Sequence, residues 1–181
     1  WTEVNDLNTS RMGLSAGGTQ TSGIAFGGNV TPFNTGKDLA ESWNGSSWTE
    51  VADMNTARWY SAGGGASNTS AIVAGGEIPS PPRTAATEVW NGSSWTEVND
   101  LNSARYSVAF AGIATSAIAF SGVEPLPAEG QRTEEWNGTN WSNVQDTPTA
   151  KTSSKGIGTA TAALQVGGYT TTYVATVEEW N

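Results

Sequence analysis

One nine-residue stretch constrains the fold of this chain more than any other feature. Residues 43–51 read Trp-Asn-Gly-Ser-Ser-Trp-Thr-Glu-Val, and the stretch returns at residues 90–98 and, in looser form, at residues 136–144. Two half copies lie at the ends: Trp1-Thr2-Glu3-Val4 matches the second half and residues 178–181 match the first half. A sequence that repeats in this way predicts a series of equivalent structural units, and the period must be settled before any domain count.

Each copy of the stretch predicts a β-hairpin. Asn-Gly tolerates the positive φ values of a tight turn, and the flanking Trp residues can pair across the two strands. Aligned on the second Trp, the units begin at Trp1, Trp48, Trp95 and Trp141.

The units share one internal order. A polar link with a basic residue is followed by a strand of small residues and then by a short apolar strand that ends at a Gly pair, or at Ser-Gly in the third unit. A loop of variable length comes next, followed by a strand with an acidic residue before the next Trp. The apolar strands are expected at residues 24–26, 71–74, 117–120 and 163–166, and continuous apolarity predicts burial on both faces. Four short strands per unit are typical of a β-propeller blade, with the small-residue strand nearest the axis.

Composition supports an all-β fold and excludes several functions. The 181 residues include 22 Gly and 36% apolar residues, so we expect almost no helix. A net charge of −9 argues against nucleic acid as a partner. The chain has no Cys and no His, which removes thiol nucleophiles, Ser-His triads and the usual zinc, haem and copper sites. We therefore expect no enzyme activity, no cofactor and no metal. No apolar run has the length of a membrane span, so no membrane insertion is expected, and the Trp at position 1 leaves room for a targeting segment upstream.

These motifs resemble the kelch repeat family. The marks are a second strand ending in Gly-Gly, an aromatic residue in the third strand, a Trp a few residues later, and an Arg in the link to the next blade. The resemblance covers residues 1–181 and implies a single four-bladed kelch-like β-propeller with four-stranded antiparallel blades. The near-identity of the hairpin copies also resembles repetitive kelch-like proteins of bacteriophage virions and bacterial surfaces. Kelch-type oxidases need Cys, His and copper, so that activity does not carry over to this chain.

The two half copies predict how the ring closes. Trp1–Val4 has the sequence of a fourth strand, and residues 176–180 form a third strand without a partner. We expect the N-terminal strand to complete the last blade within the chain, because this removes two open sheet edges. The alternative is self-association by strand exchange, in which the same strand completes a neighbouring copy and produces a larger ring or a filament.

One rim of the propeller is the expected binding surface. The link between blades and the loop between the second and third strands emerge on the same rim, and the loops 29–40, 77–87, 123–133 and 169–176 vary most. The candidate rim residues are Arg11, Arg58, Trp59, Tyr60, Arg83, Arg105, Arg132 and Lys151. The alternative for the basic link residues is a structural pair with the strand-three Glu of a neighbouring blade, and for Trp59 it is packing. The eight repeated Trp residues are expected in the core rather than as sugar platforms.

The expected function is that of a non-catalytic structural or adhesive module in an extracellular, virion or cell-surface assembly. Its partners would be other protein subunits or a surface glycan. The alternative is a glycan-binding, lectin-like propeller. The acidic residues of the hairpins and links are expected to cap turns or face solvent rather than bind calcium, since no Asp-x-Asp-x-Asp-Gly cluster is present.

Overall fold

The structure is a computed structural model, which describes residues 1–30, 35–80, 82–124 and 130–181. These residues form strands and no helix, as predicted, and so they include no helix that could cross a membrane. The strands of blade 1 are β1 (Ser15–Thr19), β2 (Ser22–Phe26), β5 (Ala40–Trp43) and β6 (Trp48–Val51). The strands of blade 2 are β7 (Ala62–Ser67), β8 (Ser70–Ala74), β9 (Thr87–Trp90) and β10 (Trp95–Val98).

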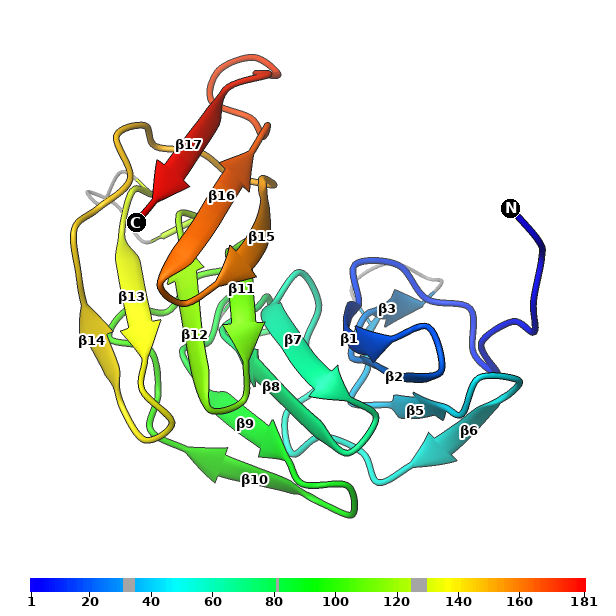
Figure 1. The fold of residues 1–181 in the computed structure, drawn as a ribbon. Coiled ribbons are helices and arrows are strands. Elements are labelled where there is room, and N and C mark those ends of the chain that lie inside the picture. Colours follow the sequence, from blue (N-terminus) through cyan, green and yellow to red (C-terminus); the bar gives the residue numbers. More distant parts are fainter. Residues whose placement is uncertain (31–34, 81, 125–129) are drawn as a thin grey trace.

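The second half of the chain continues the pattern. The strands of blade 3 are β11 (Ala109–Ile113), β12 (Ser116–Phe120), β13 (Thr133–Trp136) and β14 (Trp141–Asn143). The strands of blade 4 are β15 (Lys155–Thr159), β16 (Ala162–Val166) and β17 (Val177–Trp180). A small hairpin of β3 (Asn29–Val30) and β4 (Thr35–Gly36) lies within the loop of blade 1. All pairings are antiparallel, and the four blades have the arrangement of a four-bladed β-propeller (Figure 1).

The inner strands pack against one another in chain order, β1 on β7, β7 on β11 and β11 on β15. Small residues make this approach possible. A Cβ atom added to Gly17 would overlap the backbone of Gly64 and Gly65, and one added to Gly156 would overlap the backbone of Phe110. The position of the small-residue strand nearest the axis is therefore confirmed, and its composition follows from the lack of space there.

The core lies between neighbouring blades. Ile24, Ile72 and Ile118, at matching positions of β2, β8 and β12, are completely buried. The prediction of burial on both faces is thus confirmed for three blades. It is wrong for blade 4, where Leu164 at the matching position of β16 is 39% exposed, because no further blade covers that face.

The repeated stretch forms the predicted hairpins. In the second copy, the Asn91 side-chain oxygen accepts hydrogen bonds from the backbone N–H groups of Ser93 and Ser94 at 2.9 and 3.0 Å. Gly92 has a φ of 96°, which favours glycine. Trp90 and Trp95 face each other across the strands with ring centroids 5.5 Å apart. The turn is therefore built from local chemistry.

The predicted closure of the ring is wrong. Residues 1–7 form no strand, blade 4 has three strands among the described residues, and β15 does not pack on β1 as the other inner strands pack on their neighbours. The two termini lie at opposite ends of an open arc (Figure 1). Two features favour the open arc. Asn5 Nδ2 donates to the backbone oxygen of Ser46 at 2.8 Å, which keeps this segment on blade 1. Ile157 of β15 also stands where β1 and β7 have Gly17 and Gly64, and its bulk is unsuited to a narrow axis.

Candidate functional site

The basic link residues form buried ion pairs with the acidic residue of the third strand. Arg11 Nη2 lies 2.8 Å from Glu41 Oε1, and Arg58 Nη2 lies 2.6 Å from Glu88 Oε1. The corresponding distance is 3.2 Å for Arg105 and Glu134, and Lys151 Nζ lies 3.1 Å from Glu178. None of the four basic side chains reaches the surface.

These pairs correct the assignment of Arg11, Arg58, Arg105 and Lys151 as candidate rim contacts. The alternative of a structural ion pair is the one observed, but the acidic partner belongs to the same blade and not to a neighbouring blade. A ligand at the rim cannot touch these cations without breaking the fold.

The backbone of the same residues joins consecutive blades. The N–H of Gly28 in blade 1 donates to the carbonyl oxygen of Arg58 at 2.9 Å, and Gly76 donates in the same way to Arg105 at 2.9 Å. Gly122 donates to Lys151 at 3.0 Å. The second residue of each predicted Gly pair, and of Ser-Gly in blade 3, thus donates the backbone hydrogen bond that joins its blade to the next one. Arg58, Arg105 and Lys151 each hold their own blade through the side chain and the preceding blade through the backbone.

The acidic partners have no free oxygen for a ligand in the first three blades. Asn55 donates both its backbone N–H and its side-chain amide to Glu88 Oε2, at 2.7 and 2.9 Å, and Asn8 and Asn102 make the same contacts in their blades. Burial lowers the pKa of Arg58, while the charge of Glu88 acts in the opposite direction. Burial likewise lowers the pKa of Arg105, opposed mainly by Glu134. Each carboxylate therefore offsets part of the free-energy cost of burying the charged guanidinium.

A row of left-handed residues lines the blade entries on this rim. Gly13, Tyr60, Ser107 and Ser153 follow the basic link at equivalent positions, and their φ values lie between 50° and 64°. Tyr60 N donates to Gly13 O at 2.8 Å, Ser107 N to Tyr60 O at 2.7 Å, and Ser153 N to Ser107 O at 3.3 Å. We call this series the entry ladder. It holds Tyr60 in a conformation that bulky residues rarely adopt, so the position of this exposed ring is set by the scaffold.

Trp59 is not an exposed aromatic residue. It is 3% exposed, and it packs over Gly36, where a Cβ would overlap the indole ring. Its assignment as a candidate ligand contact is therefore corrected in favour of packing. The reason is that the β3–β4 hairpin of blade 1 covers it, and sequence patterns do not show which loop covers which side chain.

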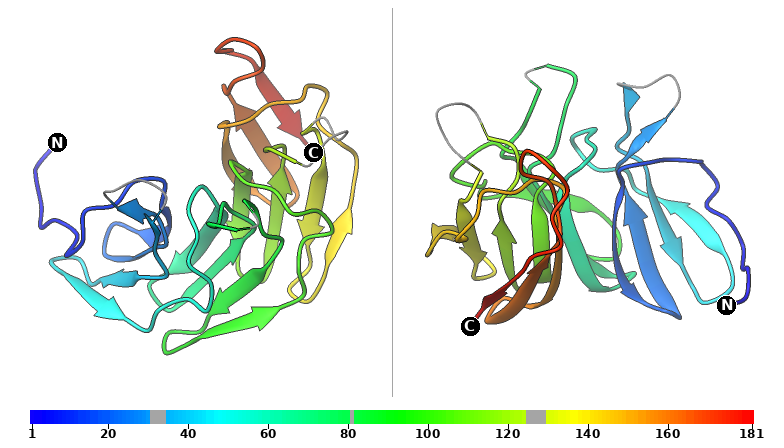
Figure 2. Two further views of the ribbon diagram at one scale, coloured as in Figure 1. Left: turned by 180° about the vertical axis from the view of Figure 1, so that it is seen from behind. Right: turned by 90° about the horizontal axis from the view of Figure 1, so that it is seen from above.

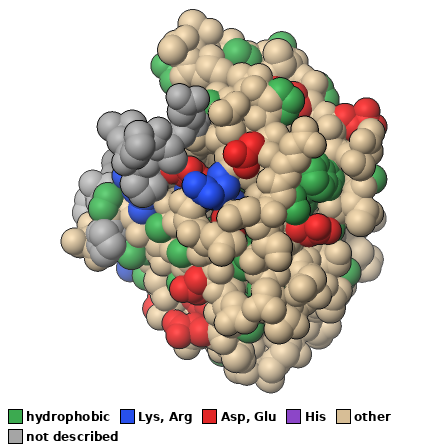
Figure 3. All heavy atoms as spheres, turned by 90° about the vertical axis from the view of Figure 1, so that its left-hand side faces the viewer, with side chains coloured by type: hydrophobic (Ala, Val, Ile, Leu, Met, Phe, Trp, Pro, Cys, Tyr) green, Lys and Arg blue, Asp and Glu red, His purple; other side chains and the backbone are tan. Residues whose placement is uncertain are grey.

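Of the two candidate Arg residues in the loops, Arg132 remains accessible and Arg83 is half-buried. Arg132 Nε lies 3.1 Å from Glu124 Oε1, and its side chain is 36% exposed. Arg83 places its guanidinium carbon 5.9 Å from the ring centre of Tyr106. Glu124, a second buried acid beside Arg105, was not predicted because it lies in the variable part of the chain. On the side of the molecule shown in Figure 3, basic side chains lie next to acidic ones near the centre of the view.

The aromatic surface of the rim is larger than predicted. Tyr60, Tyr169 and Tyr173 are exposed, and the last of these is 91% exposed. Tyr169 and Tyr173 pack edge to face at 5.5 Å and border a cleft that includes Thr152, Ser153 and Val174. Their loop was identified from its variability, but the two Tyr residues were not singled out. The loops that carry this surface project from one side of the molecule (Figure 2). Residues 31–34, 81 and 125–129 of the candidate loops lie outside the described residues.

The hairpin and link carboxylates lie apart from this surface. Asp100 accepts a hydrogen bond from Thr87 N and Asp146 accepts one from Thr133 N, both at 3.1 Å. Each of these carboxylates thus holds the first residue of a third strand, which is a contact within the blade and not the predicted turn cap. In the described part of the chain, no group of three or more Asp or Glu residues is arranged to hold a metal ion. Comparison with protein-family models and with curated proteins finds no match for the chain.

Proposed function

We propose that the chain is a kelch-like propeller that acts as a non-catalytic structural or adhesive module, and that its rim loops bind other protein subunits. We place it in an extracellular, virion or cell-surface assembly. The observation that supports this proposal is that the repeated and the variable residues of the rim differ in exposure. The repeated cations are buried in ion pairs, while the exposed positions are occupied by different residues in each blade, with Tyr prominent among them.

Tyr is suited to such a surface. It supplies a large contact area with few rotatable bonds, and it is enriched at protein interfaces. The entry ladder holds Tyr60, and edge-to-face packing orients Tyr169 against Tyr173. These side chains lose little further freedom on binding, which favours recognition by a rigid surface.

Site-specific photocrosslinking in the native host tests this proposal. A photoreactive residue in place of Tyr173 should crosslink to a discrete protein. The same residue in place of Asn91, on the hairpin at the opposite rim, serves as the control and should not. Crosslinks from position 91 alone, or from neither position, would count against a protein-binding rim.

The lectin alternative is supported by the exposed Tyr169–Tyr173 pair. A cleft bordered by two aromatic rings and by the hydroxyl groups of Thr152 and Ser153 offers both a stacking face and polar contacts to a sugar ring. Glycan-array binding that is lost in Tyr173→Ser, together with the absence of a protein crosslink, would favour this function.

A further inference from the structure

The junction between blades 1 and 2 and the junction between blades 2 and 3 each contain a Trp residue from a fourth strand. Trp95 of β10 packs edge-on against Phe26 of blade 1, with ring centroids 5.0 Å apart. Trp141 of β14 donates its Nε1–H to Thr87 Oγ1 of blade 2 at 3.0 Å. Both Trp residues are 6% exposed. The second Trp of a hairpin thus fills the space between its own blade and the preceding one.

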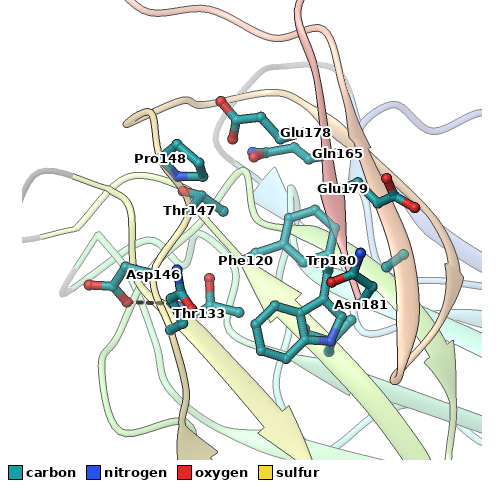
Figure 4. A pocket seen from close by; sticks show the side chains of 13 residues that line it. Phe120, Thr133, Asp146, Thr147, Pro148, Gln165, Glu178, Glu179, Trp180 and Asn181 are labelled. Atoms are coloured by element: carbon teal, nitrogen blue, oxygen red, sulfur yellow. Dashed lines mark hydrogen bonds between the residues drawn. The ribbon is translucent and has the colours of Figure 1, made fainter.

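The junction between blades 3 and 4 has the same walls around an open pocket. The pocket measures about 180 Å³ and is lined by Phe120, Thr133 and Trp180, among others (Figure 4). Phe120 ends β12 as Phe26 ends β2, and Thr133 begins β13 as Thr87 begins β9. Trp180 donates to the backbone oxygen of Ala160 at 2.8 Å, as Trp136 does to Ala114. All three groups that receive a Trp ring elsewhere are therefore in place.

The outer edge of β17 borders this pocket. On its other side β17 pairs with β16, and among the described residues no strand pairs with the outer edge. Val177 and Leu164 are exposed on this blade, although Thr133 and Ile118 at the matching positions of blade 3 are buried. Blade 4 therefore offers a strand edge and an apolar face.

Trp1–Val4 has the sequence of the strand that fills the junction between blades 1 and 2. It reads Trp-Thr-Glu-Val, identical to β6 and β10, and it lies outside any strand, with Trp1 fully exposed and Val4 63% exposed. It extends from the blade-1 end of the arc, away from β17 (Figure 1). Trp48 of blade 1 is only half-buried, whereas its counterparts Trp95 and Trp141 are buried. Blade 1 thus shows the face that a preceding blade covers elsewhere.

From these observations we propose that a second copy of the chain completes blade 4. Its Trp1–Val4 segment adds to the edge of β17 and its Trp1 ring enters the pocket. The register of β9 with β10 places Trp1 opposite Trp180 and Val4 opposite Val177. The Trp1 ring then lies against Phe120 and Trp180, and its Nε1–H donates to Thr133 Oγ1. Blade 1 of the second copy covers Leu164 and Val177, and the entry ladder continues from its Gly13 N–H to Ser153 O. This assembly does not depend on what the rim binds.

Sedimentation equilibrium over a range of concentrations tests the proposal. The chain should associate, and Trp1→Ala should weaken association by roughly 30-fold, as expected for an interface Trp. Tyr173→Ser, on the rim, is the matched control and should leave the mass unchanged. An acetylated Trp-Thr-Glu-Val-Asn-Asp peptide should compete with association, and the same peptide with Ala in first place should not.

Thr133→Val keeps the shape of the pocket and removes the acceptor, so it should weaken peptide binding by about five-fold. A chain that stays monomeric at all concentrations would overturn the proposal, including a monomer in which Trp1 is protected by closure within the chain. Association that survives Trp1→Ala unchanged would also overturn it.

Discussion

Arg58 Nη2 lies 2.6 Å from Glu88 Oε1, with both side chains fully buried, and the backbone oxygen of the same Arg accepts a hydrogen bond from Gly28 of the preceding blade. A single residue thus connects the third strand of its own blade with the loop of its neighbour. Since this arrangement recurs at Arg105, the repeated cations serve the scaffold, and the rim is left to the variable residues.

Removing one partner of this buried pair should destabilise the fold strongly. We expect Glu88→Leu to lower the free energy of unfolding by about 3–5 kcal/mol, because it leaves Arg58 charged and uncompensated. The double variant Arg58→Met/Glu88→Leu should cost less than Glu88→Leu alone. Urea unfolding measures all three. Lys155→Met, at an exposed position, is the control and should change stability by no more than about 0.5 kcal/mol. Similar losses for Glu88→Leu and the control would contradict a structural role for the pair.

The inner strands should tolerate no added methyl group at the axis. Gly17→Ala would bring a Cβ into the backbone of Gly64 and Gly65, and we expect a loss of about 1–3 kcal/mol. Gly23→Ala is the matched control, because its nearest neighbours lie at 3.5–3.7 Å and β8 and β12 carry Ala71 and Ala117 at the same position. It should be neutral or slightly stabilising. Thermal unfolding of the two variants compares them directly, and equal melting temperatures would argue against close packing at the axis.

The contribution of a hairpin's second Trp to stability should depend on whether a preceding blade covers it. Trp95→Ala removes a ring packed on Phe26 and should cost about 3–5 kcal/mol. Trp48→Ala removes a half-buried ring at the outer face of blade 1 and should cost much less in dilute solution, where the chain is alone. Denaturant unfolding at low concentration distinguishes the two, and a loss for Trp48→Ala as large as that for Trp95→Ala would mean that blade 1 is already covered.

The hairpin turns should contribute modestly to stability and not at all to binding at the rim. Asn91→Ala removes the acceptor for the backbone N–H groups of Ser93 and Ser94, and we expect a loss of about 1 kcal/mol. Ser93→Ala removes one exposed side-chain contact to the same oxygen and should cost less. Neither should change photocrosslinking from position 173, because the turn and the rim lie at opposite ends of the blade. A change there would show that the hairpin takes part in binding.

The candidate site was predictable only in part. The basic link residues and the strand Glu residues recur in every unit, so a structural ion pair could be weighed from the sequence. Which blade holds the partner could not be read, since that depends on how the link turns between blades. The burial of Trp59 and the exposure of Tyr173 had no sequence signal, because each depends on loops whose length and composition do not repeat.

The sequence by itself determined the hairpins, the order of strands within a blade and the need for small residues nearest the axis. These features follow from local turn chemistry and from a pattern repeated at a fixed period, so the residues of each unit specify its own strands and turns. Only the tertiary structure decided that the arc stays open. Closure depends on how far each blade turns from the next, and that angle is set by packing between residues far apart in the chain, such as Trp95 on Phe26. The open pocket beside Trp180 is the consequence, since no strand among the described residues fills it.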